Sequence, residues 1–255
     1  MKSIASWSGG KDSTAQIIIA HEKGEPLDLI IFSEVMFDEN VSGELPEHIK
    51  FIKNKCIPLF KSWGYETKTL HSDKTYIDYF LHTVKNSRVE KRNGKRAGFP
   101  MAGKCAINRD CKINAINKFF SFFKEEFIQY IGIAIDEPKR LARLEGNKMS
   151  LLAKHGYTEQ MAHDLCKKYD LLSPIYDFAP RGGCWFCPNA RKAELKHLRN
   201  NHRDLWDKLL ELEEMPNLIG NKWNTLTQTS IHEIEERFLW ESRQMTIFDI
   251  LGHDI

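Results

Sequence analysis

The chain of 255 residues lacks a long uninterrupted apolar segment. Its most apolar stretch, residues 119–135, contains Lys124, Glu125 and Glu126. A membrane-spanning helix needs about 20 predominantly apolar residues in a row. The N-terminus has Lys2 but no apolar run typical of an export signal. We therefore expect a cytoplasmic protein with no membrane contact.

The chain also lacks a large excess of charge of either sign, and it contains few cysteines. Lys and Arg number 37 against 35 Asp and Glu, so the net charge of +2 neither requires nor excludes an anionic partner. Six cysteines without an export signal argue against a disulfide framework. Cys56 and Cys166 each stand alone in a helical pattern, and we expect both to be buried as small apolar side chains.

Strand and helix patterns alternate in the first half of the chain. Strands are predicted for residues 3–7, 27–35, 65–70 and 127–135, and helices for residues 12–23, 44–64, 75–86 and 111–126. Asp12 or Ser13 is the expected N-cap of the first helix, and Gly64 is placed to end the second. This alternation predicts a doubly wound, mostly parallel α/β sheet of Rossmann-like type.

The pattern changes after about residue 136, where charged helical segments (158–170 and 190–215) are separated by loops rich in Pro and Gly. We expect an α/β domain over residues 1–190 and a helical C-terminal extension over residues 191–255 that packs on it.

The segment SGGKDS, residues 8–13, connects the first predicted strand to the first predicted helix. Glycines there let backbone N–H groups approach an anion, and Lys11 adds a positive charge. The Walker A pattern fails, because Ala5 and Asp12 stand where it requires Gly and Ser or Thr. The dinucleotide fingerprint lacks its third glycine. A phosphate site is one interpretation, and a plain glycine-rich turn with a helix cap is the other.

Four segments, taken in order, resemble a known family. SGGKDS resembles the PP-loop of the adenine nucleotide alpha-hydrolases, the ATP pyrophosphatase group. VMFDENVSGELPEHIKFI (35–52), YIGIAIDEPKRLARL (130–144) and SPIYDFAPRGGCWFCP (173–188) resemble the phosphoadenosine phosphosulfate (PAPS) reductase family, in particular its prophage-type and DNA-phosphorothioation-like members. The resemblance covers about residues 1–190.

The resemblance implies an adenine nucleotide, ATP or PAPS, bound at the C-terminal ends of the strands. Mg²⁺ is expected with it if the reaction is cleavage of ATP. The implied phosphate ligands are Ser8, Gly9, Gly10, Lys11, Asp12 and Ser13. The backbone of Phe32, Ser33 and Glu34 would contact the adenine, with Asp38 close by. Lys112, Arg140 and Arg143 would face the anionic end of the ligand, and the two arginines, three residues apart, are expected to share a helix face. The implied catalytic residues are Lys11, Asp12, Ser13 and the two arginines.

Four of the cysteines form two pairs. Cys184 and Cys187 make a Cys-x-x-Cys turn behind two glycines, and Cys105 and Cys111 lie upstream. Four thiolates can bind an iron–sulfur cluster or a structural Zn²⁺, and the residues alone leave both open. The family resemblance implies a [4Fe–4S] cluster, although in the family's reducing branch the first pair is adjacent.

A rival zinc site would use Cys184, Cys187, His197 and His202. The nine residues between Cys187 and His197 are fewer than zinc fingers use.

Residues 85–104 are rich in Lys and Arg, and Glu90 is their only acid. Their composition suggests a mobile loop. It could cover phosphates, contact a nucleic-acid partner, or be a solvated charged loop.

Three functions fit these patterns. The first is an enzyme that cleaves ATP to AMP and pyrophosphate to activate a substrate for sulfur transfer, with a nucleic acid or a sulfur-donor protein as a possible partner. The second is reduction of adenylyl sulfate or PAPS to sulfite, and the third is a non-catalytic nucleotide-binding module. PAPS reductases that use thioredoxin have a cysteine in a C-terminal Glu-Cys-Gly-Leu-His element. No cysteine follows Cys187 here, which disfavours the second function. The intact SGGKDS segment disfavours the non-catalytic module, so the first function is expected.

Overall fold

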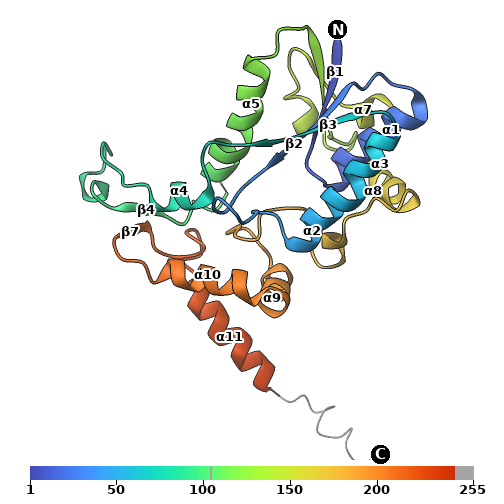
Figure 1. The fold of residues 1–255 in the computed structure, drawn as a ribbon. Coiled ribbons are helices and arrows are strands. Elements are labelled where there is room, and N and C mark those ends of the chain that lie inside the picture. Colours follow the sequence, from blue (N-terminus) through green and yellow to red (C-terminus); the bar gives the residue numbers. More distant parts are fainter. Residues whose placement is uncertain (104, 245–255) are drawn as a thin grey trace, which may run out of the picture. The chain divides into compact units, whose positions relative to one another are not determined.

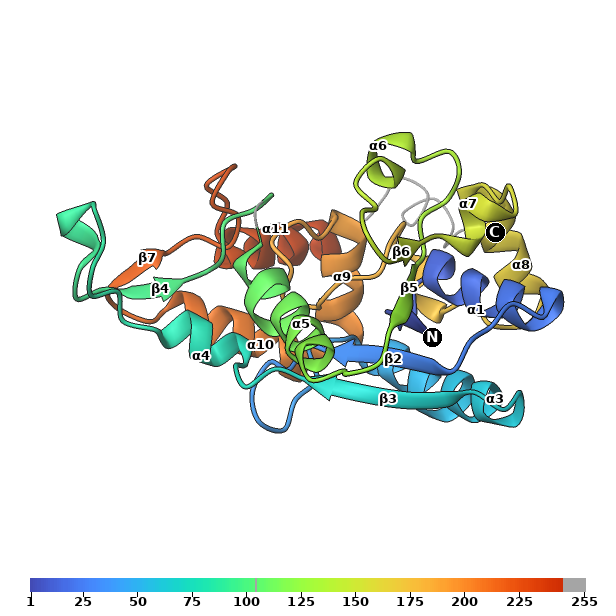
Figure 2. The ribbon, with the colours of Figure 1, turned by 90° about the horizontal axis from the view of Figure 1, so that it is seen from above.

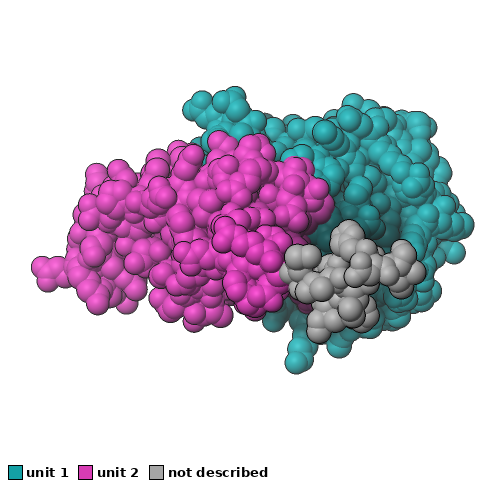
Figure 3. Space-filling model, turned by 90° about the horizontal axis from the view of Figure 1, so that it is seen from below, with its two compact units in different colours: residues 1–76, 107–184 teal, residues 77–106, 185–255 magenta. Residues whose placement is uncertain are grey.

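The computed structural model describes residues 1–103 and 105–244. It forms two compact units, coloured separately in Figure 3: unit 1 contains residues 1–76 and 107–184, and unit 2 contains residues 77–106 and 185–255. These units do not coincide with the expected division at residue 190, because residues 77–106 belong with the C-terminal helices. Lys104 of the basic segment and residues 245–255 lie outside the described residues. The latter include most of the C-terminal segment in which a thioredoxin-dependent reductase would have its cysteine.

Unit 1 is built on a parallel sheet of five strands in the order β3-β2-β1-β5-β6. Figure 2 shows β2 and β3 side by side along their length. The strands are β1 (Lys2–Trp7), β2 (Leu29–Glu34), β3 (Glu66–His71), β5 (Phe127–Ile131) and β6 (Lys148–Met149). The strand order reverses beside β1, so the crevice for ligands in such sheets lies between the ends of β1 and β5.

The helices of unit 1 lie on both faces of this sheet. Its longer helices are α1 (Lys11–Lys23), α5 (Asn114–Ser121) and α8 (Glu159–Lys168). Its shorter elements are α2 (Pro46–Phe51), η1 (Ile52–Cys56), α3 (Ile57–Ser62), η3 (Asn108–Ile113), α6 (Pro138–Leu141), α7 (Leu151–Lys154) and η4 (Pro174–Asp177). Figure 1 shows α5 on one side of the strands and α1, α3 and α8 on the other.

Two separate apolar cores explain this arrangement, because successive strand residues face opposite sides of a sheet. Ala5, Trp7 and Phe32 pack with residues of α1, η1 and α8, whereas Ile4 and Ile31 pack against α5. The doubly wound, parallel α/β fold predicted from the sequence is confirmed. The predicted burial of Cys56 and Cys166 is also confirmed, since both are 0% exposed.

Several predicted element boundaries are wrong. Gly10, in an extended conformation, is the N-cap of α1, in place of Asp12 or Ser13. The strand predicted to reach residue 135 ends at Ile131, and the helix predicted for residues 75–86 is only α4 (Tyr76–Leu81). Runs of apolar residues do not show at which residue a strand or helix ends, because contacts with neighbouring elements determine this.

Unit 2 is mainly helical. It contains α9 (Lys192–Asn201), α10 (Arg203–Glu213) and α11 (Ile231–Arg243), with a parallel pair of short strands, β4 (Arg96–Gly98) and β7 (Leu218–Gly220). Trp206, Trp223 and Phe238 are buried in it. Glu213 accepts the N–H groups of Ile231 and His232 and so caps the start of α11.

The basic segment is not an irregular loop in this unit. The N–H of Val84 donates to the Lys95 carbonyl, and the N–H of Gly94 donates to the Val84 carbonyl. We call residues 84–95 the basic hairpin; its tip contains η2 (Glu90–Arg92). Figure 1 shows it extending beyond the β4–β7 pair.

Among the described residues, no helix has the length and apolar character needed to cross a membrane.

Candidate functional site

The SGGKDS segment forms the turn from β1 into α1, at the crevice where the strand order reverses. Gly9 has a φ of +74°, which a side chain would disfavour. The Ser13 hydroxyl donates to the Gly10 carbonyl (3.0 Å) and accepts the Ser8 N–H (3.2 Å). We call residues 8–10 the phosphate loop, after the role predicted for them from the sequence. Its hydrogen bonds to Ser13 close the turn, which leads into the first turn of α1.

Gly132, directly after β5, allows the sheet to approach this turn. A Cβ atom at Gly132 would lie 2.6 Å from the Ser13 nitrogen and 2.7 Å from the Asp12 carbonyl carbon. Backbone atoms cannot yield to such a contact as a flexible side chain can. The close approach of β5 to α1 therefore requires glycine at this position.

Lys11 is held by two carboxylates. Its Nζ lies 2.8 Å from Asp12 Oδ1 and 3.1 Å from Glu159 Oε1. Burial opposes the charged form of Lys11, but its hydrogen bonds to these carboxylates outweigh burial and raise its pKa. Burial raises the pKa of Asp12, and the negative charges of Glu159 and Glu137 raise it further. The hydrogen bond from Lys11 lowers the pKa but does not outweigh these effects. The lysine is therefore positively charged and positioned at the start of α1.

His48 of α2 lies directly against the phosphate loop and was not identified from the sequence. It is 1% exposed, and a Cβ on Gly9 would lie 2.7 Å from its Cε1. Its Nδ1 is 2.7 Å from the Ser173 hydroxyl and its Nε2 is 3.4 Å from the Ser8 carbonyl. Burial lowers the pKa of His48, which keeps the ring neutral near pH 7. A histidine inside a helical pattern has no local signal for such a contact.

The residues expected near the adenine lie at the end of β2. The Ser33 hydroxyl donates to the Lys112 carbonyl (3.3 Å), so the structure brings these two predicted residues together. Glu34 is 2% exposed and contacts Lys53 and His71. Burial opposes its ionisation, but hydrogen bonds from Ser42, His71 and Lys53 lower the pKa of Glu34. These side chains are held in place beside the crevice.

Two other predicted positions have local structural partners. Asp38 Oδ1 accepts the N–H groups of Asn40 and Val41 at 2.8 and 2.7 Å and closes the turn after β2. Arg140 of α6 pairs with Glu137, the N-cap residue of that helix. The predicted shared helix face of Arg140 and Arg143 is wrong, because α6 ends at Leu141 and Arg143 follows it. Whether the two arginines bind the ligand stays a prediction.

The four cysteines of the predicted metal site are distributed over both units. Cys111 and Cys184 belong to unit 1, and Cys105 and Cys187 belong to unit 2. Cys111 is fully buried on η3, and the other three are half-buried. The four-cysteine site stays a prediction.

The remaining two cysteines are poor ligand candidates for a chemical reason. Burial raises the pKa of Cys56, and it raises the pKa of Cys166 to about 12. Metals bind the thiolate, and a raised pKa disfavours its formation. Both side chains pack in the apolar core of unit 1.

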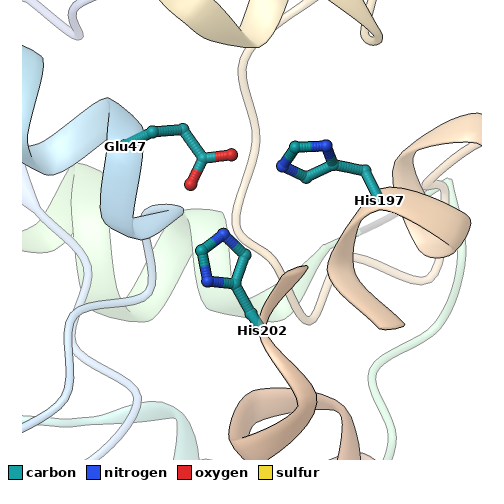
Figure 4. A group of neighbouring side chains, drawn as sticks. All are labelled: Glu47, His197 and His202. Atoms are coloured by element: carbon teal, nitrogen blue, oxygen red, sulfur yellow. The ribbon is translucent and has the colours of Figure 1, made fainter. Parts of the chain in front are cut away.

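The histidines of the rival zinc site both lie in unit 2. His197 is on α9 and His202 is at its C-terminal end, with ring centroids 5.8 Å apart. Figure 4 shows these two side chains and, from α2 of unit 1, Glu47. The rival site also needs Cys184 and Cys187, and it stays an alternative prediction.

No protein-family model matches this chain, and no curated protein matches it. A solved structure that is similar is "U34-tRNA thiolase NcsA from Methanococcus maripaludis with its [4Fe-4S] cluster". The identity is 15%, the match covers 92% of this chain and 80% of that chain, and the TM-score is 0.43. A likeness of this size does not assign an activity.

Proposed function

We propose that this chain is an adenine-nucleotide-binding enzyme of the PAPS reductase family that cleaves ATP to AMP and pyrophosphate to activate a substrate for sulfur transfer. One observation carries the proposal. The SGGKDS segment lies at the reversal of strand order in a parallel sheet, with Lys11 at the start of α1. A helix N-terminus and a lysine at such a crevice suit the phosphates of a nucleotide.

The chemistry follows from this placement. A substrate oxygen attacks the α-phosphorus, the bond from the α-phosphorus to the bridging oxygen breaks, and pyrophosphate leaves with that oxygen. Lys11 and the N–H groups of the phosphate loop would stabilise the charge of the leaving pyrophosphate. The Asp12 carboxylate could serve as a ligand of the Mg²⁺ that accompanies the nucleotide, since Mg²⁺ prefers oxygen ligands. A sulfur nucleophile would then attack the substrate carbon that bears the adenylylated oxygen, the carbon–oxygen bond breaks, and AMP leaves with that oxygen.

The other predicted contacts keep their places in the proposal. The backbone of Phe32, Ser33 and Glu34 would bind the adenine, next to Asp38. Lys112, Arg140 and Arg143 would contact the anionic end of the nucleotide.

The four cysteines Cys105, Cys111, Cys184 and Cys187 would hold a [4Fe–4S] cluster, as the family resemblance implies. Four thiols including a Cys-x-x-Cys turn are a suitable donor set. Zn²⁺ at the same thiols is the alternative.

A nucleic-acid partner is favoured by one further observation. The basic hairpin exposes Lys85, Arg88, Lys91, Arg92 and Lys95 around the single acid Glu90. Within the described part of the chain, no ion pair neutralises these five cations. Such a surface suits a phosphate backbone.

Calorimetric titration with ATP tests the proposed site. Lys11→Ala removes a charged hydrogen-bond donor, an interaction of about 1.5–3 kcal/mol, so ATP affinity should fall by about one to two orders of magnitude. Lys61→Ala, an exposed lysine at the end of α3, is the matched control and should bind as the wild type does. ATP binding that Lys11→Ala leaves unchanged would contradict the assignment of the phosphate loop.

A further inference from the structure

The first N–H group of α1 has a partner from a distant part of unit 1. The Lys11 N–H donates to the hydroxyl oxygen of Tyr176 at 2.8 Å, although 165 positions separate the two residues. Gly10, the N-cap, has no side chain with which to accept such a bond. Tyr176 therefore caps the helix that begins the candidate nucleotide site.

The hydroxyl of Tyr176 also remains a hydrogen-bond donor. In the described part of the chain, its own hydrogen has no acceptor. Burial is the main reason why the pKa of Tyr176 is raised, so the proton stays on the oxygen at neutral pH. A Cβ on Gly10 would lie 3.4 Å from this oxygen and 3.4 Å from the Ser8 hydroxyl, which places both hydroxyls beside the phosphate loop.

A buried hydrogen-bond chain holds the turn that carries Tyr176. Ser173, the N-cap of η4, accepts the Ile175 N–H (3.4 Å) through its hydroxyl oxygen. The hydroxyl hydrogen is then available to His48 Nδ1 at 2.7 Å, and the tautomer with a proton on Nε2 donates to the Ser8 carbonyl at 3.4 Å. Ser173 and His48 are 2% and 1% exposed. His48 thus ties the tyrosine turn to the phosphate loop.

We propose that Tyr176 is a phosphate-binding residue, which donates its hydroxyl hydrogen to a phosphate oxygen of the nucleotide at the loop, and that His48 and Ser173 are its positioning residues. This inference rests on the proposed nucleotide site. The phosphate would receive a donor set in three parts: the helix N-terminus, the Lys11 ammonium and the Tyr176 hydroxyl. The hydroxyl is fixed before the ligand arrives, so little ordering is required on binding.

The test is the binding of two ligands, ATP and adenosine, to Tyr176→Phe. Loss of the hydroxyl should weaken ATP binding by about tenfold, the range of a single hydrogen bond to a charged group. Adenosine affinity should not change, because adenosine has no phosphate. Tyr169→Phe is the matched control; its hydroxyl bonds to Glu22. The melting temperature of each variant reports the loss of a structural bond separately.

Ser173→Ala and Ser173→Thr test the positioning chain. Ala should weaken ATP binding several-fold and leave adenosine unchanged, and Thr, which keeps the hydroxyl, should restore ATP binding. A merely structural role would lower both affinities together with the melting temperature, and this result would overturn the inference.

The inference and the proposed function fail in different ways. Wild-type protein that binds no ATP would refute both. ATP binding that is lost in Lys11→Ala but unchanged or tighter in Tyr176→Phe would overturn the role of Tyr176 alone and leave the nucleotide site in place.

Discussion

The candidate site combines the SGGKDS segment with three single residues from other parts of unit 1. Gly132 admits the first turn of α1, His48 packs against Gly9, and Tyr176 caps the Lys11 N–H. SGGKDS could be identified from the sequence because the chemistry of a phosphate loop is local: two glycines, a lysine and two hydroxyls in six residues. The contacts of His48 and Tyr176 could not, because they arise only when segments far apart in the chain meet.

At this scale we predict a pH effect from His48. Its pKa is lowered from the ordinary 6.5 by burial, which outweighs Glu44 and Glu47, while nearby Lys112 also lowers it. In the interval between the lowered pKa and 6.5 the unfolded chain binds more protons, so stability falls as the pH drops below 6.5. The experiment is thermal unfolding of wild type and His48→Gln between about pH 7.5 and about pH 5.5.

The wild type should lose stability more steeply towards acid than His48→Gln does. Carboxylates with a lowered pKa, such as Glu34, also destabilise the protein in acid, but they do so equally in both proteins. Parallel curves for the two proteins would show that His48 makes no contribution to the pH dependence of stability and would contradict a lowered pKa.

At the scale of elements, the parallel sheet was predictable and several helix limits were not. Segments of continuous apolar residues, such as 27–35, are typical of strands covered on both faces, and both cores of unit 1 require this. The helix expected to carry Arg140 and Arg143 is shorter than the spacing suggested. The basic segment, expected to be a mobile loop, has the backbone pairing of a hairpin. Backbone pairing between two chain segments is difficult to predict from a sequence in which charged residues dominate.

The basic hairpin leads to a prediction for nucleic-acid binding. Lys91→Ala combined with Arg92→Ala removes two exposed cations. If both contact phosphates, the slope of log K against log salt should become less steep by about 1.8 for a labelled duplex and about 1.4 for a single strand. Fluorescence anisotropy over a range of salt concentrations measures this slope.

The matched control for the hairpin is Lys23→Ala combined with Lys61→Ala, which removes two exposed lysines from unit 1. It changes the net charge equally and should keep the wild-type slope. Equal slopes for the hairpin variant and this control would refute a specific role of the hairpin. Binding to an acidic protein but to no nucleic acid would do the same.

For the whole molecule, the division into two units has a consequence for the cysteines. The predicted ligands are divided between the units, with Cys111 and Cys184 in unit 1 and Cys105 and Cys187 in unit 2. Residue spacing identified the two pairs, but it could not show that the two members of each pair belong to different units.

The metal prediction is tested on protein purified without oxygen. A [4Fe–4S] cluster should give about four iron and about four sulfide per chain, with broad absorption near the blue. Cys187→Ser should lose most of the iron, whereas Cys56→Ser, at a buried position with a raised pKa, should keep it. About one zinc per chain with negligible iron would replace the cluster by a structural zinc site.

The most direct test of the central claim is to identify the products formed from ATP. Protein in excess over ATP is incubated with Mg²⁺, and PAPS with a thiol reductant is supplied in a parallel reaction. With water as the attacking oxygen in the absence of the acceptor substrate, the account predicts AMP and pyrophosphate in equal amounts from ATP, and no such products with Lys11→Ala. Formation of ADP and phosphate, or of sulfite from PAPS while ATP stays intact, would contradict it.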